Sequence, residues 1–149
     1  MNLSDFEIIK EPFACILKKY NGTDKIVKIP SDIDGTKITT IGSYSFMGSS
    51  MEGVIIPKGV TSINIHAFGV CINLKTVVMP DTIKYIERTA FYRCESLNKI
   101  IFKGTPEQWK KITNNSPLAN SVKVIYDTSS KLSSFLNIVS DLEEIEYKE

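Results

Sequence analysis

Residues 54–76 have the sequence VIIPKGVTSINIHAFGVCINLKT, and residues 77–99 have the sequence VVMPDTIKYIERTAFYRCESLNK. Both stretches place an apolar run before a proline, then an Ala-Phe pair, a cysteine and a leucine, at the same positions. A third apolar run, Ile100-Ile101-Phe102, begins another 23 residues further on. A fixed period of this length is typical of solenoids, in which each unit buries its apolar side against its neighbours. The sequence therefore predicts stacked coils, and it says much more about fold than about function.

The apolar run of each unit predicts a short strand with two distinct sides, because side chains alternate along a strand. The side that joins the Phe and Leu rows of the turns should face the interior; its members are Val27, Val54, Val77 and Ile100 with Ile29, Ile56, Met79 and Phe102. The proline after the strand ends the ladder, since it has no N–H to donate. The opposite side carries the row Lys28, Ile55, Val78 and Ile101, flanked by Ile26, Gly53, Thr76 and Lys99.

The chain is expected to be a single domain over residues 1–149, with repeats at 26–104 between two caps. Residues 1–25 predict an N-terminal β cap, which would cover the open ladder and core of the first coil. The first unit is longer than the others, and its Asp34-Gly35 pair marks a wider turn.

Residues 105–149 predict a C-terminal cap with helices and an acidic tail. Thr105-Pro106-Glu107-Gln108 has the residues of a helix start, with Trp109 and Ile112 on one face of that helix. Ser116-Pro117 is a second candidate helix start, and Val122–Tyr126 is expected to be a closing strand. After a candidate cap at Ser129 or Ser130, apolar residues recur at helical spacing, namely Leu132, Phe135, Leu136, Val139 and Leu142.

Charge is distributed unevenly although the whole chain has a formal net charge of +1. Residues 54–126 contain ten Lys or Arg against four Asp or Glu, a balance of +6. Residues 141–149 contain five acidic residues against Lys148, a balance of −4. A basic body with an acidic tail suits an anionic partner, although a solvated surface explains the pattern equally simply.

Cysteine usage and hydropathy give information on the cellular compartment of the protein. Cys71 and Cys94 occupy equivalent repeat positions, which indicates small buried core residues that stay reduced. No apolar run approaches the roughly 20 residues that span a bilayer. The start, Met1–Glu7, has neither the basic nor the apolar region of a signal peptide. The chain as written is therefore expected in the cytoplasm, and outside the cell if a leader has been removed.

Catalytic residue patterns are missing from the sequence. His66 is the single histidine, and it occupies a variable turn position rather than that of a general base. The spacings of zinc sites and phosphate loops do not occur. Asp32 and Asp34 fit a turn, and Trp109 fits a core position beside Ile112. We therefore expect no enzyme activity, no catalytic residue, no metal and no cofactor.

The repeat unit resembles the BspA-like, or Treponema pallidum-type, leucine-rich repeats. The pattern I-P-x-x-V-x-x-I-x-x-x-A-F-x-x-C-x-x-L-x-x-(I/V) spans Ile56 to Val77 and Met79 to Ile100, and the sequence from Phe102 to Trp109 is similar to the closing element of such repeats. The resemblance covers about residues 26–126. It implies a β-rich α/β fold: a right-handed leucine-rich-repeat solenoid with a parallel sheet on one face, an N-terminal β cap and a C-terminal helical cap. Many relatives are surface proteins that bind host matrix or other cells.

Three apolar side chains in a row on an outer sheet face, at Ile55, Val78 and Ile101, are unusual for a soluble protein. We therefore predict a protein–protein interaction surface there, completed by Lys28, Thr76 and Lys99. The same row could instead support self-association. Two further hypotheses are a small intracellular inhibitor or decoy acting on a nucleic-acid enzyme, and a fragment or spacer of a surface adhesin. Direct binding of nucleic acid is disfavoured, because the basic residues are not interleaved with aromatics on one strand.

Overall fold

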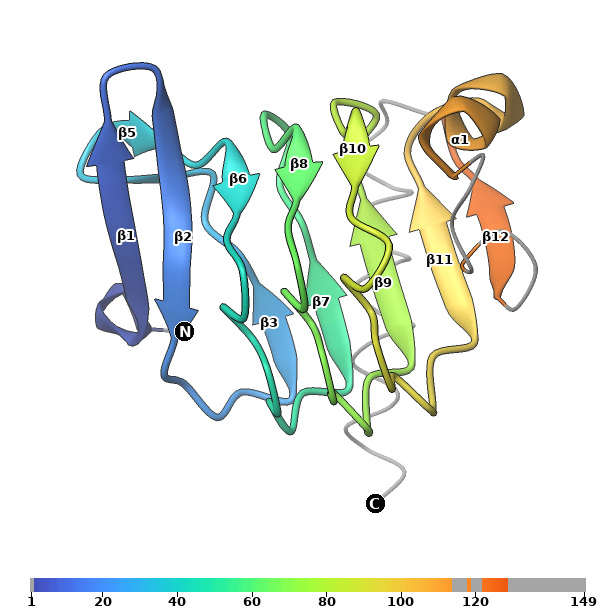
Figure 1. The fold of residues 1–149 in the computed structure, drawn as a ribbon, viewed down its shortest axis with the longest axis horizontal. Coiled ribbons are helices and arrows are strands. Elements are labelled where there is room, and N and C mark those ends of the chain that lie inside the picture. The colour runs from blue at the N-terminus through green and yellow to red at the C-terminus, as the bar shows by residue number, and fades with distance from the viewer. Residues whose placement is uncertain (1, 114–117, 119–121, 129–149) are drawn as a thin grey trace.

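The computed structural model describes residues 2–113, 118 and 122–128. It is a right-handed β-solenoid in which successive coils lie side by side (Figure 1). One side is a five-stranded sheet, called here the main sheet, in the order β12-β11-β9-β7-β3. Its strands are all parallel and comprise β3 (Ile26–Lys28), β7 (Gly53–Ile55), β9 (Thr76–Met79), β11 (Lys99–Phe102) and β12 (Lys123–Tyr126).

A second sheet lies across the core from the main sheet, in the order β1-β2-β6-β8-β10. Its members are β1 (Phe6–Glu11), β2 (Ala14–Tyr20), β6 (Thr40–Ile41), β8 (Ser62–Ile63) and β10 (Tyr85–Ile86). The sequence predicts only a turning segment at these return positions. Because the coils stack in register, the two-residue extended segments of neighbouring coils pair with one another, and a second ladder forms.

The strand register of the main sheet follows the 23-residue period of the sequence. Val54 pairs with Val77, and Val77 pairs with Ile100, so equivalent residues stand side by side. The side chains of all three are fully buried. These residues, predicted to face the interior, therefore do so.

Phenylalanines of successive turns form a column of stacked rings inside the molecule. The centroids of Phe68 and Phe91 are 5.1 Å apart with an interplanar angle of 8°, and those of Phe46 and Phe68 are 5.0 Å apart at 17°. The column continues into the N-terminal cap through Tyr20 and Phe6, with centroid spacings of 5.2 and 5.0 Å. Offset aromatic stacking at these distances contributes beyond the burial of area alone. The stacking expected from the repeat is confirmed.

The cysteines of the repeat connect one turn to the turn before it. Cys71 Sγ donates to the carbonyl oxygen of Phe46 at 3.1 Å, and Cys94 Sγ donates to that of Phe68 at 3.0 Å. The thiols are free, as expected for small core residues. The thiol thus adds a second hydrogen bond to a turn carbonyl that already accepts a backbone N–H, from Ser49 at Phe46 and from Cys71 at Phe68.

The N-terminal cap is a hairpin that extends the second sheet. A short 3-10 helix, η1 (Leu3–Asp5), precedes β1, and β2 pairs in parallel with β6 of the first coil. The hairpin turn places Phe13 in solvent, fully exposed, although the nearby Cys15 and Leu17 of β2 are buried. The wider turn expected at Asp34-Gly35 is the tip of a small hairpin of β4 (Asp32–Ile33) and β5 (Thr36–Lys37), where both residues have positive φ.

The C-terminal side contains the predicted helix, α1 (Pro106–Thr113), followed by β12. Gln108 N–H donates to Thr105 Oγ1 at 3.2 Å, while Thr105 N–H donates to Gln108 Oε1 at 2.9 Å, which is a complete capping box. Trp109 is buried and packs 5.2 Å from the Phe102 ring, as expected for a core residue. The predictions for Ser116-Pro117, Ser129 or Ser130, the stripe from Leu132 to Leu142 and the acidic tail lie outside the described residues.

Candidate interaction surface

The outer face of the main sheet brings the predicted site residues together. Strand pairing places Lys28 beside Ile55, Ile55 beside Val78, and Val78 beside Ile101. The same pairing adds Ile125 of β12 beside Ile101, a member of the row that was not predicted. The position of Ile125 within Val122–Tyr126 could have indicated this, because that segment resembles the apolar run of β11. It follows a helix, however, whereas each earlier run follows a turn. We call the row Ile55, Val78, Ile101 and Ile125 the outer apolar row.

Burial along this row differs from the expectation. The sequence predicts exposed side chains, yet Ile55, Val78 and Ile101 retain only 7%, 3% and 6% of their accessible surface. Exposure rises toward both sheet edges, where Ile125 is 37% exposed and Lys28 is also exposed. The predicted exposure of the three central residues is therefore wrong. Alternation along a strand determines which way a side chain points, but it carries no information about what lies above it.

The central row is a separate cluster and not an extension of the core. Ile55, Val78 and Ile101 pack together, with the partly buried Ile26 against them, on the opposite side of the sheet from the main core. The flanking residue Thr76 is also buried, and Lys99 is half-buried. The molecule thus has two apolar clusters separated by one layer of backbone.

Lysines surround the outer apolar row. Lys28 and Lys123 are exposed at the two edge strands, and Lys99 is half-buried between them. Lys103 follows on the same face and forms an ion pair with Asp127, with Nζ and Oδ2 2.6 Å apart. An apolar strip with a basic border favours a ligand that combines apolar side chains with acidic residues.

A group of aromatic side chains lies on the turns, away from the main sheet. The rings of Tyr44 and His66 stack at 5.3 Å, and Tyr92 meets His66 edge-on at 5.2 Å. The Arg93 guanidinium lies 5.8 Å from the centroid of Tyr92. Tyr44 and Tyr92 are each about half exposed, at 51% and 50%. We call Tyr44, His66 and Tyr92 the aromatic ridge.

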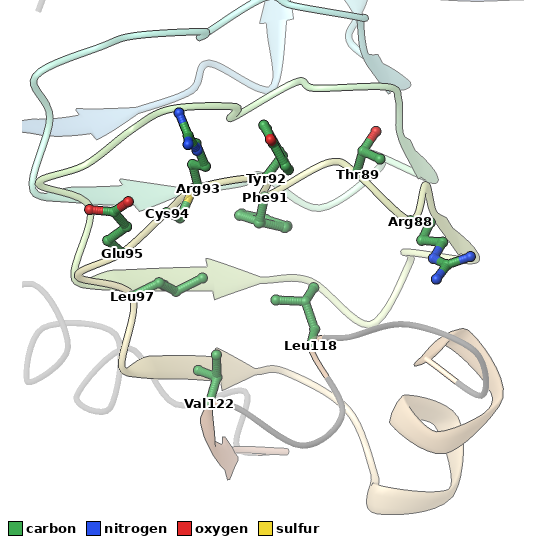
Figure 2. A pocket seen from close by; sticks show the side chains of 10 residues that line it. All are labelled: Arg88, Thr89, Phe91, Tyr92, Arg93, Cys94, Glu95, Leu97, Leu118 and Val122. Carbon is green, nitrogen blue, oxygen red and sulfur yellow. The ribbon is translucent and has the colours of Figure 1, made fainter.

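A pocket of about 520 Å³ opens beside the last turn of the repeat (Figure 2). Its apolar floor includes Phe91, Leu97 and Val122, while Arg88 and Arg93 lie at its border. The Cys94 thiol lines the pocket, but it already donates to the Phe68 carbonyl. The interaction with Cys94, together with burial, raises the pKa of the neighbouring Cys71 thiol well above its ordinary value, while the same interaction lowers the pKa of Cys94.

The described residues contain no cluster of three or more His, Cys, Asp or Glu side chains that could hold a metal ion. His66 sits on the ridge with positive φ, and its Nδ1 is buried without a hydrogen bond to any described residue. No carboxylate or nucleophile forms a hydrogen bond with this imidazole within the described part of the chain. Over residues 2–113, 118 and 122–128, no helix is long and apolar enough to traverse a lipid bilayer.

Comparison with solved structures places the fold among bacterial leucine-rich-repeat proteins. A T. pallidum leucine-rich-repeat protein is 25% identical, with a TM-score of 0.65 over 85% of this chain and 64% of its own length. A leucine-rich-repeat protein from Bacteroides capillosus is 22% identical, with a TM-score of 0.69 over 85% of this chain and 97% of its own. One from Bacteroides ovatus is 22% identical, with a TM-score of 0.60 over 85% and 37%.

The family assignment comes from the sequence profile of the repeat. A search of curated proteins finds no match. The model of the BspA type leucine rich repeat region, in 6 copies, matches residues 39–148. This range contains the repeats with their Ala-Phe and Cys positions, and it continues through α1 and β12. The chain belongs to the BspA type leucine-rich-repeat family.

Proposed function

We propose that this protein is a non-catalytic module that binds another protein through the outer face of the main sheet, around Ile55, Val78 and Ile101. Leucine-rich-repeat proteins generally mediate protein–protein interaction or adhesion, and solenoids present extended sheet faces to their partners. Lys28, Thr76 and Lys99 complete the proposed surface. Two other roles, that of an inhibitor or decoy and that of an adhesin fragment, stay predictions. Membership of the family does not distinguish between them.

The observation that carries the proposal is the second apolar cluster. The main core already closes the solenoid on the inner side of the strands. Three large aliphatic side chains on the outer side add nothing to that closure, and they would cost solubility if left open. Their presence is explained if this face binds an apolar surface.

The energy available to such an interface is limited and favours a selective one. Transfer of a fully exposed aliphatic side chain from water to a partner is worth roughly 1.5–3 kcal/mol, and in the outer apolar row only Ile125, at 37% exposure, has much surface left to bury. Part of that gain is lost to the entropy of association, so the apolar strip needs help from its border. The lysines Lys28, Lys99 and Lys123 supply this help for an acidic partner, and they would favour fast encounter at low salt.

The test is partner capture from the native source, scored by its dependence on this face. Ile125→Asp and Lys99→Glu alter the strip and its border at positions that are not fully buried. Both should release the captured protein while the circular dichroism spectrum and melting temperature stay near wild type. The matched control is Tyr44→Ala with Tyr92→Ala on the aromatic ridge, which should leave capture unchanged.

The aromatic ridge is the second candidate surface for the same function. Tyr44 and Tyr92 are the two tyrosines of the ridge, and each is about half exposed. Exposed tyrosines supply contact area at a low entropy cost. If the ridge variant loses the captured protein while Ile125→Asp and Lys99→Glu keep it, the ridge is the binding site and the proposal for the main sheet is refuted.

A further inference from the structure

The link between β2 and β3 contains the sequence Asn21-Gly22, which is the only Asn-Gly pair in the chain. Asn21 is exposed and lies outside any helix or strand. Asparagine is one of the chemically labile residues of proteins. A glycine after it removes the Cβ that would hinder the approach of its main-chain nitrogen to the asparagine side chain. The pair therefore has the composition and the exposure of a chemically reactive site.

The aromatic column of the core requires the glycine of this pair. A Cβ at position 22 would collide with the hydroxyl of Tyr20, so the hydroxyl occupies the place of a side chain. The ring of Tyr20 is held between those of Phe6 and Phe46, with centroid distances of 5.0 and 5.2 Å. Packing of the N-terminal cap thus fixes Tyr20, and Tyr20 leaves room only for glycine after Asn21.

We infer that Asn21 deamidates spontaneously and that the product weakens the N-terminal cap. The main-chain nitrogen of Gly22 gives up its proton and attacks Cγ of Asn21, and the side-chain nitrogen leaves as ammonia. A cyclic imide remains, and water opens it at either of its two carbonyl carbons. One opening gives aspartate, and the other gives isoaspartate. Water is the only reagent, and the inference goes beyond the proposed function because it needs no partner.

Deamidation reverses the sign of a contact in the cap. Asn21 Nδ2 donates to Oε1 of Glu7 in β1 at 2.9 Å, and the Asn21 main-chain N–H donates to the Asp5 carbonyl oxygen at 2.7 Å. The product places a carboxylate, which only accepts hydrogen bonds, where the amide donated to a carboxylate. Lys19 stands opposite Glu7 in the hairpin, but within the described residues no ion pair joins the two. The attraction between the link and β1 therefore becomes a repulsion.

Isoaspartate has a further effect on the main chain. Its backbone runs through the former side-chain carbon, which lengthens the chain by one atom between residues 21 and 22. Gly22 must then move relative to the Tyr20 hydroxyl that packs against it. The hairpin of β1 and β2 lies at one end of the row of coils (Figure 1), where it covers the end of the core. We expect the altered cap to open more often, while β9 and β11 keep their structure.

Ageing of the intact protein at neutral pH and physiological temperature tests the reaction. Peptide mapping by mass spectrometry should find aspartate and isoaspartate at position 21, formed several-fold faster than at Asn73 or Asn98. Those two asparagines are also exposed, but leucine and lysine follow them, so they are internal controls. The variant Asn21→Gln should convert far more slowly, because its imide ring would be larger. Equal rates at the three asparagines would overturn the inference.

Two variants test the effect on the cap. Asn21→Asp introduces the charge of the product, whereas Asn21→Ala removes the same hydrogen bond without adding a charge. Amide hydrogen exchange in β1 and β2 should be several-fold faster in Asn21→Asp than in Asn21→Ala. High salt should reduce this difference, because it screens repulsion between exposed charges. Equal exchange of β1 in the two variants would refute the weakening of the cap. Neither experiment involves a partner, so failure here is distinct from failure of the proposed function.

Discussion

Strands β7, β9 and β11 have two apolar sides that differ in what covers them. On the inner side, Val54, Val77 and Ile100 are buried by the return segments and turns of the same coils. On the outer side, Ile55, Val78 and Ile101 are almost as buried, yet they form a separate cluster that packs, within the described residues, only with Ile26 of the same sheet among hydrophobic side chains. The inner side is thus closed by the repeat itself, whereas the described coils do not close the outer side. Burial alone does not distinguish a core from a binding face; the covering residues do.

The largest effect is expected where the inner side is broken. Phe68→Ala removes the middle ring of the column between Phe46 and Phe91, and a cavity surrounded by stacked coils collapses poorly. We expect a loss of about 3–5 kcal/mol in the free energy of unfolding. Denaturant titration measures it, with Phe13→Ala as the control, because Phe13 is fully exposed in the hairpin turn. Equal losses for the two variants would contradict the stacked column.

Two adjacent residues of β11 compare the inner and outer sides directly. Ile100→Val on the inner side should cost about 0.5–1.5 kcal/mol of unfolding free energy in any background. Ile101→Val on the outer side should cost a similar amount in the otherwise wild-type chain. A much smaller cost for Ile101→Val than for Ile100→Val would show that the outer cluster is packed less tightly than the inner core.

These two variants also show where inference from sequence stops. Ile100 and Ile101 are both β-branched, both in the strand and both in register with the next coil, so the period predicts the direction of each side chain. The inner cover is encoded in the repeat as the Phe, Leu and Cys positions, and it could be predicted. The repeat pattern contains no position that would cover the outer side, and it therefore predicts that Ile101 is exposed.

The same limit explains the other differences. The short strands β6, β8 and β10 have no distinctive composition, because their pairing is imposed by the stacking of coils around them. Ile125 was not predicted because α1 replaces the turn that precedes each earlier strand. In contrast, the capping box at Thr105 and Gln108 is a local pattern, and it was predicted correctly.

A smaller effect concerns the turns between the two sides. Val70 has φ of 57°, a left-handed conformation that is unfavourable for a β-branched residue, whereas Gly48 occupies the equivalent position with φ of 73°. Val70→Gly removes a strain of about 1–2 kcal/mol and adds a backbone entropy cost of about 0.5–1 kcal/mol. We expect a small net rise in melting temperature. Gly48→Val should lower it, since the space around Gly48 is open and only its φ opposes a side chain. A fall on Val70→Gly would mean that the Val70 contacts outweigh the strain.

The smallest effect is a pH dependence at the last turn. The carboxylate of Glu87 accepts hydrogen bonds from the Thr89 hydroxyl and from the Thr89 N–H, both at 2.6 Å, and these bonds lower the pKa of Glu87. A lowered pKa in the folded state means that the stabilisation is complete above the unfolded pKa and is lost as pH falls through the folded pKa. Glu87→Gln should therefore lower the melting temperature slightly at neutral pH and not at all in strong acid. A pH-independent difference between the two proteins would contradict this role.

The one-to-one register of β7, β9 and β11 has a consequence for how such a protein evolves. Because residue i of β7 or β9 pairs with residue i + 23 of the next strand, an in-frame duplication of residues 57–79 would join each new strand to matching neighbours on both sides. Such an insertion would lengthen the molecule by one rung without demanding any compensating change at the junctions. Chain length in this architecture is therefore an easily varied trait, limited by the hairpin at one end and the helix at the other.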